Sequence, residues 1–136
     1  MRQAFFGKLD QVLHRGSLPS GASTKSLWQD LKRDITLIPE VPDANPLASF
    51  GHLFGGYDAR YYGYLWSEVY SAALFEEFKV VGFDENGHPK DPAIGRRYRQ
   101  HILAPGLTHD SSEGIRAFLG KDPTPDPFIR SIGLSD

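Results

Sequence analysis

Tyrosine side chains recur at a helical spacing between Phe50 and Phe78 of this 136-residue chain. Tyr57, Tyr61 and Tyr64 stand at i, i+4 and i+7, which places their hydroxyl groups along one ridge if the stretch is helical. A phenol is neutral near pH 7 and can donate a hydrogen bond from a rigid apolar body. Such a row could face a ligand, whereas the spacing alone favours a packed aromatic helix with satisfied hydroxyl groups.

A glycine-rich loop precedes these tyrosines and contains His52. Gly51, Gly55 and Gly56 lack the Cβ atom that restricts backbone angles, so the loop can bend or let another chain approach closely. The imidazole of His52 adds a second kind of polar group to the tyrosine hydroxyls. Loop and tyrosine helix together are expected to span residues 50–80.

The same helix carries apolar side chains on the face opposite the tyrosines. Tyr62, Trp66, Val69 and Ala73 fall on that second face at about 100° per residue. A helix that is apolar all round is usually buried. We therefore expect this helix to be covered on all sides.

The rest of the chain predicts an all-α fold. The apolar stripe of a first helix begins with Phe5, Phe6 and Leu9, and its solvent face is expected to carry Lys8, Asp10 and Gln11. After the second helix, an extended crossing is predicted by Pro39, Pro42 and Pro46. Ser23 or Thr24, Asp91-Pro92 and the pair Asp110/Glu113 supply starting signals for later helices. The expected helices cover residues 2–14, 24–36, the aromatic stretch to about 80, 91–103, 110–119 and 126–132. At this length, residues 1–136 form a single helical domain or a part of one.

Several kinds of chemistry are excluded by the residues present. The five histidines include no two that are three to five positions apart, and the sequence His-Glu-x-x-His is absent, so this chain alone is not expected to build a zinc site. It has no cysteine for a disulfide or a thiolate nucleophile. The formal net charge of −2 gives no reason to expect nucleic acid as a partner, and no run of apolar residues is long enough to span a membrane.

The central stretch resembles a known family. The run from Phe50 to Phe75, with His-Leu-Phe-Gly-Gly-Tyr-Asp-Ala-Arg-Tyr-Tyr-Gly-Tyr-Leu-Trp-Ser-Glu-Val-Tyr-Ser at its centre, is similar to the C-terminal part of the thimet oligopeptidase family, the zinc endopeptidases of the M3 type. Flanking segments match as well: Arg-Gln-Ala-Phe-Phe near the start, Ile-Leu-Ala-Pro-Gly ending at Gly106, and Phe-Leu-Gly-Lys-Asp-Pro ending at Pro123. The resemblance covers the whole chain and implies the helical C-terminal portion of the M3 catalytic domain.

This resemblance also implies roles for individual residues. In M3 peptidases the residues that match His52, Tyr57 and Tyr64 face the bound peptide from one wall of a deep channel. The residue matching Tyr64 donates a hydrogen bond to the developing oxyanion, and those matching His52 and Tyr57 bind the peptide backbone and assist. Glycines 55 and 56 let the loop adapt to varied peptides, and Tyr61 either joins the same wall or packs inside.

Two hypotheses from different classes follow. In the first, the chain is a fragment of a zinc endopeptidase: it supplies the substrate-binding wall, short peptides and the missing zinc-bearing portion are its partners, and alone it holds no zinc and is inactive. In the second it is a non-catalytic peptide-binding module, or one that forms homo-oligomers through exposed aromatic faces. The cytoplasm is the expected compartment, with a mitochondrion or another organelle as the alternative.

Overall fold

The computed structural model of the chain describes residues 1–16, 18, 20–41 and 43–134. In this part of the chain the regular structure is helical, and the only β-type pairing is an isolated bridge between Phe83 and Pro89. The predicted all-α class is confirmed. Backbone contacts divide the chain into two compact units, Met1–Trp66 and Ser67–Asp136, and each is described by itself. That they form one domain stays a prediction.

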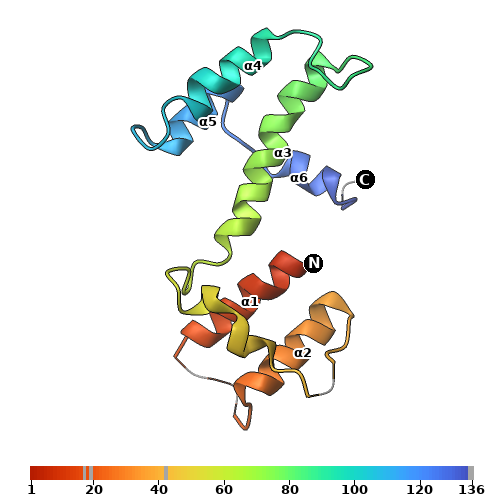
Figure 1. Cartoon of the computed structure of the whole chain (residues 1–136), viewed down its shortest axis with the longest axis vertical. Coiled ribbons are helices and arrows are strands. Elements are labelled where there is room, and N and C mark those ends of the chain that lie inside the picture. The colour runs from red at the N-terminus through yellow and green to blue at the C-terminus, as the bar shows by residue number, and fades with distance from the viewer. Residues whose placement is uncertain (17, 19, 42, 135–136) are drawn as a thin grey trace. The chain divides into compact units, whose positions relative to one another are not determined.

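The first unit is built on two helices, α1 (Arg2–His14) and α2 (Thr24–Thr36), shown in red and orange in Figure 1. Both have the predicted bounds. The Ser23 hydroxyl accepts the Ser26 N–H at 3.0 Å and the Ser26 hydroxyl accepts the Ser23 N–H at 2.9 Å, a reciprocal pair that fixes where α2 begins. The core of this unit is made by four buried side chains from the two helices: Phe5, Leu9, Leu27 and Trp28.

Two short 3₁₀ turns, Pro46–Ser49 and Gly51–Leu53, lead from α2 to the glycine-rich loop. Of the three prolines expected to extend this crossing, Pro42 lies outside the described residues. Phe50, between the two turns, stacks on Phe6 of α1 with 4.5 Å between ring centroids. This contact fixes the start of the loop against the core.

The second unit holds most of α3 (Gly63–Val81), then α4 (Ala93–Tyr98), a π-helical turn (Arg99–Leu103), α5 (Ser111–Leu119) and α6 (Asp126–Ser131). Its core comprises Ala73, Ile94, Phe118 and Leu119. The Asp110 carboxylate accepts the Ser112 N–H at 2.7 Å and caps α5, whereas the reciprocal bond from Glu113 that the expected capping box needs is not among the hydrogen bonds of the described residues. The helix predicted over 91–103 corresponds to α4 and the π-helical turn together, so it is α-helical in its first half and π-helical in its second.

Two expectations about the aromatic helix are wrong. α3 begins at Gly63, so Tyr57 and Tyr61 precede it in a series of turns instead of lying on its first two turns. In addition, α3 is not covered on all sides within the described chain. Only Val69 and Ala73 are buried, on one stripe, whereas Phe75 remains 50% exposed and Val80 84% exposed. One stripe of a helix suffices to build this unit's core, and its other apolar side chains face outward.

Candidate functional site

The structure brings His52 and three tyrosines together in the first unit. The His52 ring centroid lies 5.6 Å from that of Tyr57, 5.6 Å from that of Tyr61 and 6.1 Å from that of Tyr64. Tyr57 and Tyr64 stack with their centroids 5.5 Å apart and their planes at 26°. We call these four residues the aromatic cluster. The 3₁₀ turn carries His52, the turns before α3 carry Tyr57 and Tyr61, and the first turn of α3 carries Tyr64.

The pKa of the Tyr64 phenol is raised above its usual range, chiefly by a hydrogen-bonding interaction with the Tyr57 side chain and less by burial. The Tyr64 phenol therefore stays neutral at physiological pH and keeps its O–H group. Tyr57 is 47% exposed, His52 is exposed and Tyr64 is half-buried, so these three polar groups lie at the surface of the unit.

Tyr61 occupies a different position from the other two tyrosines. It is only 7% exposed, and its ring lies against Phe6 and Phe50 with centroid distances of 5.4 and 5.3 Å. Burial raises the pKa of its phenol, opposed in part by the positive charge of Arg2. Of the two roles expected for Tyr61, the geometry favours packing. Its ring also contacts that of Tyr64, with 4.8 Å between the ring centroids.

The two loop glycines meet distinct structural demands. A Cβ atom on Gly55 would lie 2.8 Å from the carbonyl oxygen of Gly51, closer than real Cβ contacts allow. Gly56 has φ of +93°, in the region that L-residues avoid. Their backbone conformations thus set the distance between His52, which follows Gly51, and Tyr57, which follows Gly56. The expected adaptability of this loop to peptides stays a prediction.

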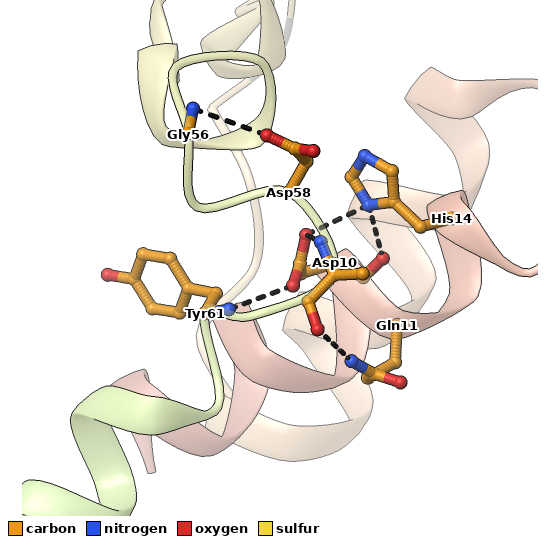
Figure 2. Close-up of polar contacts among 7 residues, drawn as sticks. Asp10, Gln11, His14, Gly56, Asp58 and Tyr61 are labelled. Atoms are coloured by element: carbon orange, nitrogen blue, oxygen red, sulfur yellow. Dashed lines mark hydrogen bonds and ion pairs between the residues drawn. The ribbon is translucent and has the colours of Figure 1, made fainter.

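Asp10 of α1 holds the turn between Tyr57 and α3 (Figure 2). Its Oδ1 accepts the backbone N–H of Ala59 and its Oδ2 that of Tyr61, both at 3.0 Å, and His14 Nδ1 lies 2.9 Å from Oδ1. Asp10 is 0% exposed, so its expected place on the solvent face of the first helix is wrong. A signal was present in the sequence: Phe6 at i−4 and Leu13 at i+3 place Asp10 on the border of the apolar stripe.

The sequence model of peptidase family M3 matches residues 1–134. The chain belongs to this family. It is 40% identical to a thimet-like oligopeptidase of Dictyostelium discoideum and 38% identical to a probable cytosolic oligopeptidase A of Arabidopsis thaliana, each over 98% of this chain and 19% of the relative. It is 32% identical to saccharolysin of Saccharomyces cerevisiae, over all of this chain and 18% of that protein.

The chain therefore spans less than a fifth of the length of these relatives. Family M3 consists of metallopeptidases, hydrolases that act on short peptides and in general depend on zinc. By their names, relatives occur in several compartments: besides the cytosolic protein, an organellar oligopeptidase A of Arabidopsis is chloroplastic or mitochondrial, and a mouse relative is a mitochondrial intermediate peptidase. Within the described residues, no helix combines the length and apolar character that crossing a membrane demands.

The zinc ion of family M3 does not fit this chain's own residues. A zinc site needs at least three protein ligands close together. Among the described residues no group of three histidine, aspartate or glutamate side chains is arranged to hold a metal, and the complete sequence lacks His-Glu-x-x-His. The donors that the aromatic cluster offers are phenols and one imidazole, which suit hydrogen bonds to a peptide rather than a metal centre. The chemistry of these four side chains is therefore that of hydrogen bonding and stacking.

Proposed function

We propose that the aromatic cluster is the substrate-facing wall of a zinc endopeptidase that cleaves short peptides. In this proposal the metal is held by another part of the peptidase. The peptide is bound by the side chains of His52, Tyr57 and Tyr64 and by the backbone at Gly55 and Gly56. The ring of Tyr61 packs against these side chains and holds them in place. The chain alone binds peptides without cleaving them.

The observation that carries the proposal is the state of the two surface phenols. Tyr57 and Tyr64 are stacked beside an exposed imidazole, outside the apolar core of their unit, and the raised pKa of Tyr64 keeps that phenol neutral. Peptide hydrolysis creates negative charge on the former carbonyl oxygen, and a neutral O–H fixed in place can donate to it without reorganisation. One donor of this kind contributes roughly 3 kcal/mol to the transition state. We assign this donation to Tyr64, which the first turn of α3 holds in place.

Binding by the intact chain is the first test. A short fluorogenic peptide with a quenched pair at its ends reports cleavage, and calorimetric titration with the same peptide reports affinity. We expect binding without turnover, and a roughly fivefold loss of affinity in Tyr57→Phe or Tyr64→Phe, the usual effect of one lost hydrogen bond. Tyr62→Phe is the matched control, because Tyr62 is 49% exposed in the same stretch and loses the same hydroxyl. Absence of binding, or chelator-sensitive turnover by this chain alone, would contradict the proposal.

Catalysis is tested in a chimera in which this chain replaces the matching region of the Dictyostelium relative. Tyr64→Phe should lower kcat by about a hundredfold or more and raise KM only about fivefold, because its hydrogen bond to the peptide becomes much stronger as the oxyanion develops. Tyr62→Phe should leave both constants unchanged. A chimera that holds zinc and cleaves peptides equally well with and without the Tyr64 hydroxyl would refute the assignment of the oxyanion donor.

The second hypothesis, a non-catalytic or oligomerising module, has one observation in its favour: the outward apolar side chains of α3, such as Phe75 and Val80. Size-exclusion chromatography across a concentration series separates the two. A concentration-dependent oligomer without peptide binding would favour the module, whereas a peptide-binding monomer would favour the peptidase wall.

A further inference from the structure

The turn from Tyr57 to Tyr62 is shaped by a carboxylate that lies about fifty positions earlier in the chain. Residues 59 and 61 in a continuous α-helix would donate their N–H groups to carbonyl oxygens four residues back. Here both donate to Asp10 instead, one to each carboxylate oxygen at 3.0 Å. A buried carboxylate is an acceptor at both oxygens, so a single side chain satisfies two backbone donors that face the same way.

A second contact from α1 supports the same turn. The Gln11 side-chain amide donates to the carbonyl oxygen of Ala59 at 2.8 Å, so α1 holds Ala59 at both its N–H and its carbonyl group. Ala59 has φ of +58°, which is unfavourable for a residue with a Cβ atom. The conformation thus depends on contacts from outside the turn, and α1 supplies three hydrogen bonds to it.

The held turn sends neighbouring tyrosines in different directions. Tyr61 points into the core against Phe6, while Tyr57 reaches Tyr64 and stacks on it. We propose that Asp10 is a positioning residue for the aromatic cluster: it fixes the backbone at Ala59 and Tyr61 so that Tyr57 and Tyr64 stay paired and face the peptide. This inference rests on the proposed function, and among the described residues the hydrogen bonds from this turn to the Asp10 side chain come from backbone N–H groups and not from a tyrosine hydroxyl.

Amide hydrogen exchange on the intact chain tests the positioning directly. In Asp10→Asn one carboxylate oxygen becomes an NH₂ group, which cannot accept, so the N–H of Ala59 or Tyr61 should exchange about tenfold faster or more. The amides of α2 should keep their exchange rates. Trypsin adds a second readout, since Arg60 lies between the two anchored amides and cleavage after it should accelerate. Asp30→Asn, an exposed aspartate on α2, is the control.

The pKa of the Tyr64 phenol gives a readout that does not change when the protein is merely destabilised. If Asp10 sets the Tyr57–Tyr64 pair, Asp10→Asn should lower the pKa of Tyr64 toward its ordinary value and weaken binding of the fluorogenic peptide about as much as Tyr57→Phe does. Leu27→Val loosens the same core from α2 without touching the turn, and should change neither the phenol titration nor the affinity.

The outcomes are distinct. Faster exchange together with weaker peptide binding in Asp10→Asn supports the inference. Normal binding in Asp10→Asn beside impaired binding in Tyr57→Phe overturns it and leaves the proposed function standing, whereas no binding by the unmodified chain overturns both. Should Asp10→Asn not fold, Gln11→Ala removes only the contact to the Ala59 carbonyl: faster cleavage after Arg60 then supports the inference, and unchanged cleavage overturns it.

Discussion

Three glycines in the loop between Phe50 and Tyr57 are chemically identical but occupy different environments, and alanine substitutions should separate them. Gly51 has open space around its Cβ direction, Gly55 approaches the Gly51 carbonyl oxygen, and Gly56 has a positive φ. Each variant adds one methyl group to the same short segment. Differences between them therefore report the local backbone and not hydrophobicity or helix propensity.

The magnitudes follow from the geometry. In Gly55→Ala the new Cβ lies 2.8 Å from a backbone oxygen that must move aside, a form of overpacking that costs about 1–3 kcal/mol. In Gly56→Ala the strain of a left-handed conformation, about 1–2 kcal/mol, is partly offset by the lower entropy of the unfolded chain, about 0.4–1 kcal/mol. Gly51→Ala meets neither obstacle and should be neutral or stabilising by up to about 1 kcal/mol.

Urea unfolding followed by tryptophan fluorescence measures these differences, because Trp28 is in the core of the same unit. The free energy of unfolding should decrease in the order Gly51→Ala, unmodified chain, Gly56→Ala, Gly55→Ala. In Gly55→Ala the displaced Gly51 carbonyl also carries His52 with it, so peptide affinity should fall more than in Gly56→Ala. Equal stabilities for the three variants, or a Gly51→Ala variant that is the least stable, would refute the reasoning.

Two further predictions concern titration. Tyr57→Phe removes the main cause of the raised Tyr64 pKa, so the phenolate absorbance of Tyr64 should appear closer to pH 10. The stability that the raised pKa supplies is present below about pH 10 and is lost as pH rises through the pKa of the folded chain. A Tyr64 titration that Tyr57→Phe leaves unchanged would contradict the interaction between the two phenols. Glu40 accepts hydrogen bonds from Trp28 at 2.6 Å and Lys32 at 3.0 Å, which lower the pKa of its carboxyl group. Glu40→Gln should therefore be less stable at pH 7, with a difference that shrinks as pH falls below about 4.3 in acid-unfolding curves; a difference that persists in acid contradicts the charge-based explanation.

Helix bounds set by neighbouring residues were predictable from the sequence. α2 begins where the serines at 23 and 26 cap each other, and α5 begins at the Asp110 cap and ends at Gly120. The start of α3 was not predictable in this way. Its spacing of aromatic residues continues back to Tyr57, and only the long-range contact to Asp10 takes the amides of Ala59 and Tyr61 out of a helical pattern. Local periodicity does not contain that competition.

The family resemblance singled out His52, Tyr57, Tyr61 and Tyr64 as site residues, which stays a prediction, and it did not give the arrangement of their side chains. The spacing suggested three equivalent tyrosines on one ridge, whereas the structure makes Tyr61 a buried support and leaves Tyr57 and Tyr64 near the surface. Burial of Tyr61 depends on Phe6 and Phe50, which come from separate segments and meet only in the folded unit. The spacing alone did not distinguish the three tyrosines, the resemblance left open whether Tyr61 packs inside, and these ring contacts favour packing.

The turn also decides which donors the aromatic cluster can offer to a ligand. Tyr57 and Tyr64 stack near the surface of the unit, where their O–H groups and the imidazole of His52 can reach a ligand. Three tyrosines on a helical ridge, with side chains about 5–6 Å apart at the Cβ atoms, would each need an outside partner. By stacking two phenols beside His52 and packing the ring of the third against Phe6 and Phe50, the turn fixes the direction of the exposed phenols, which is what the proposed donation to a developing oxyanion requires.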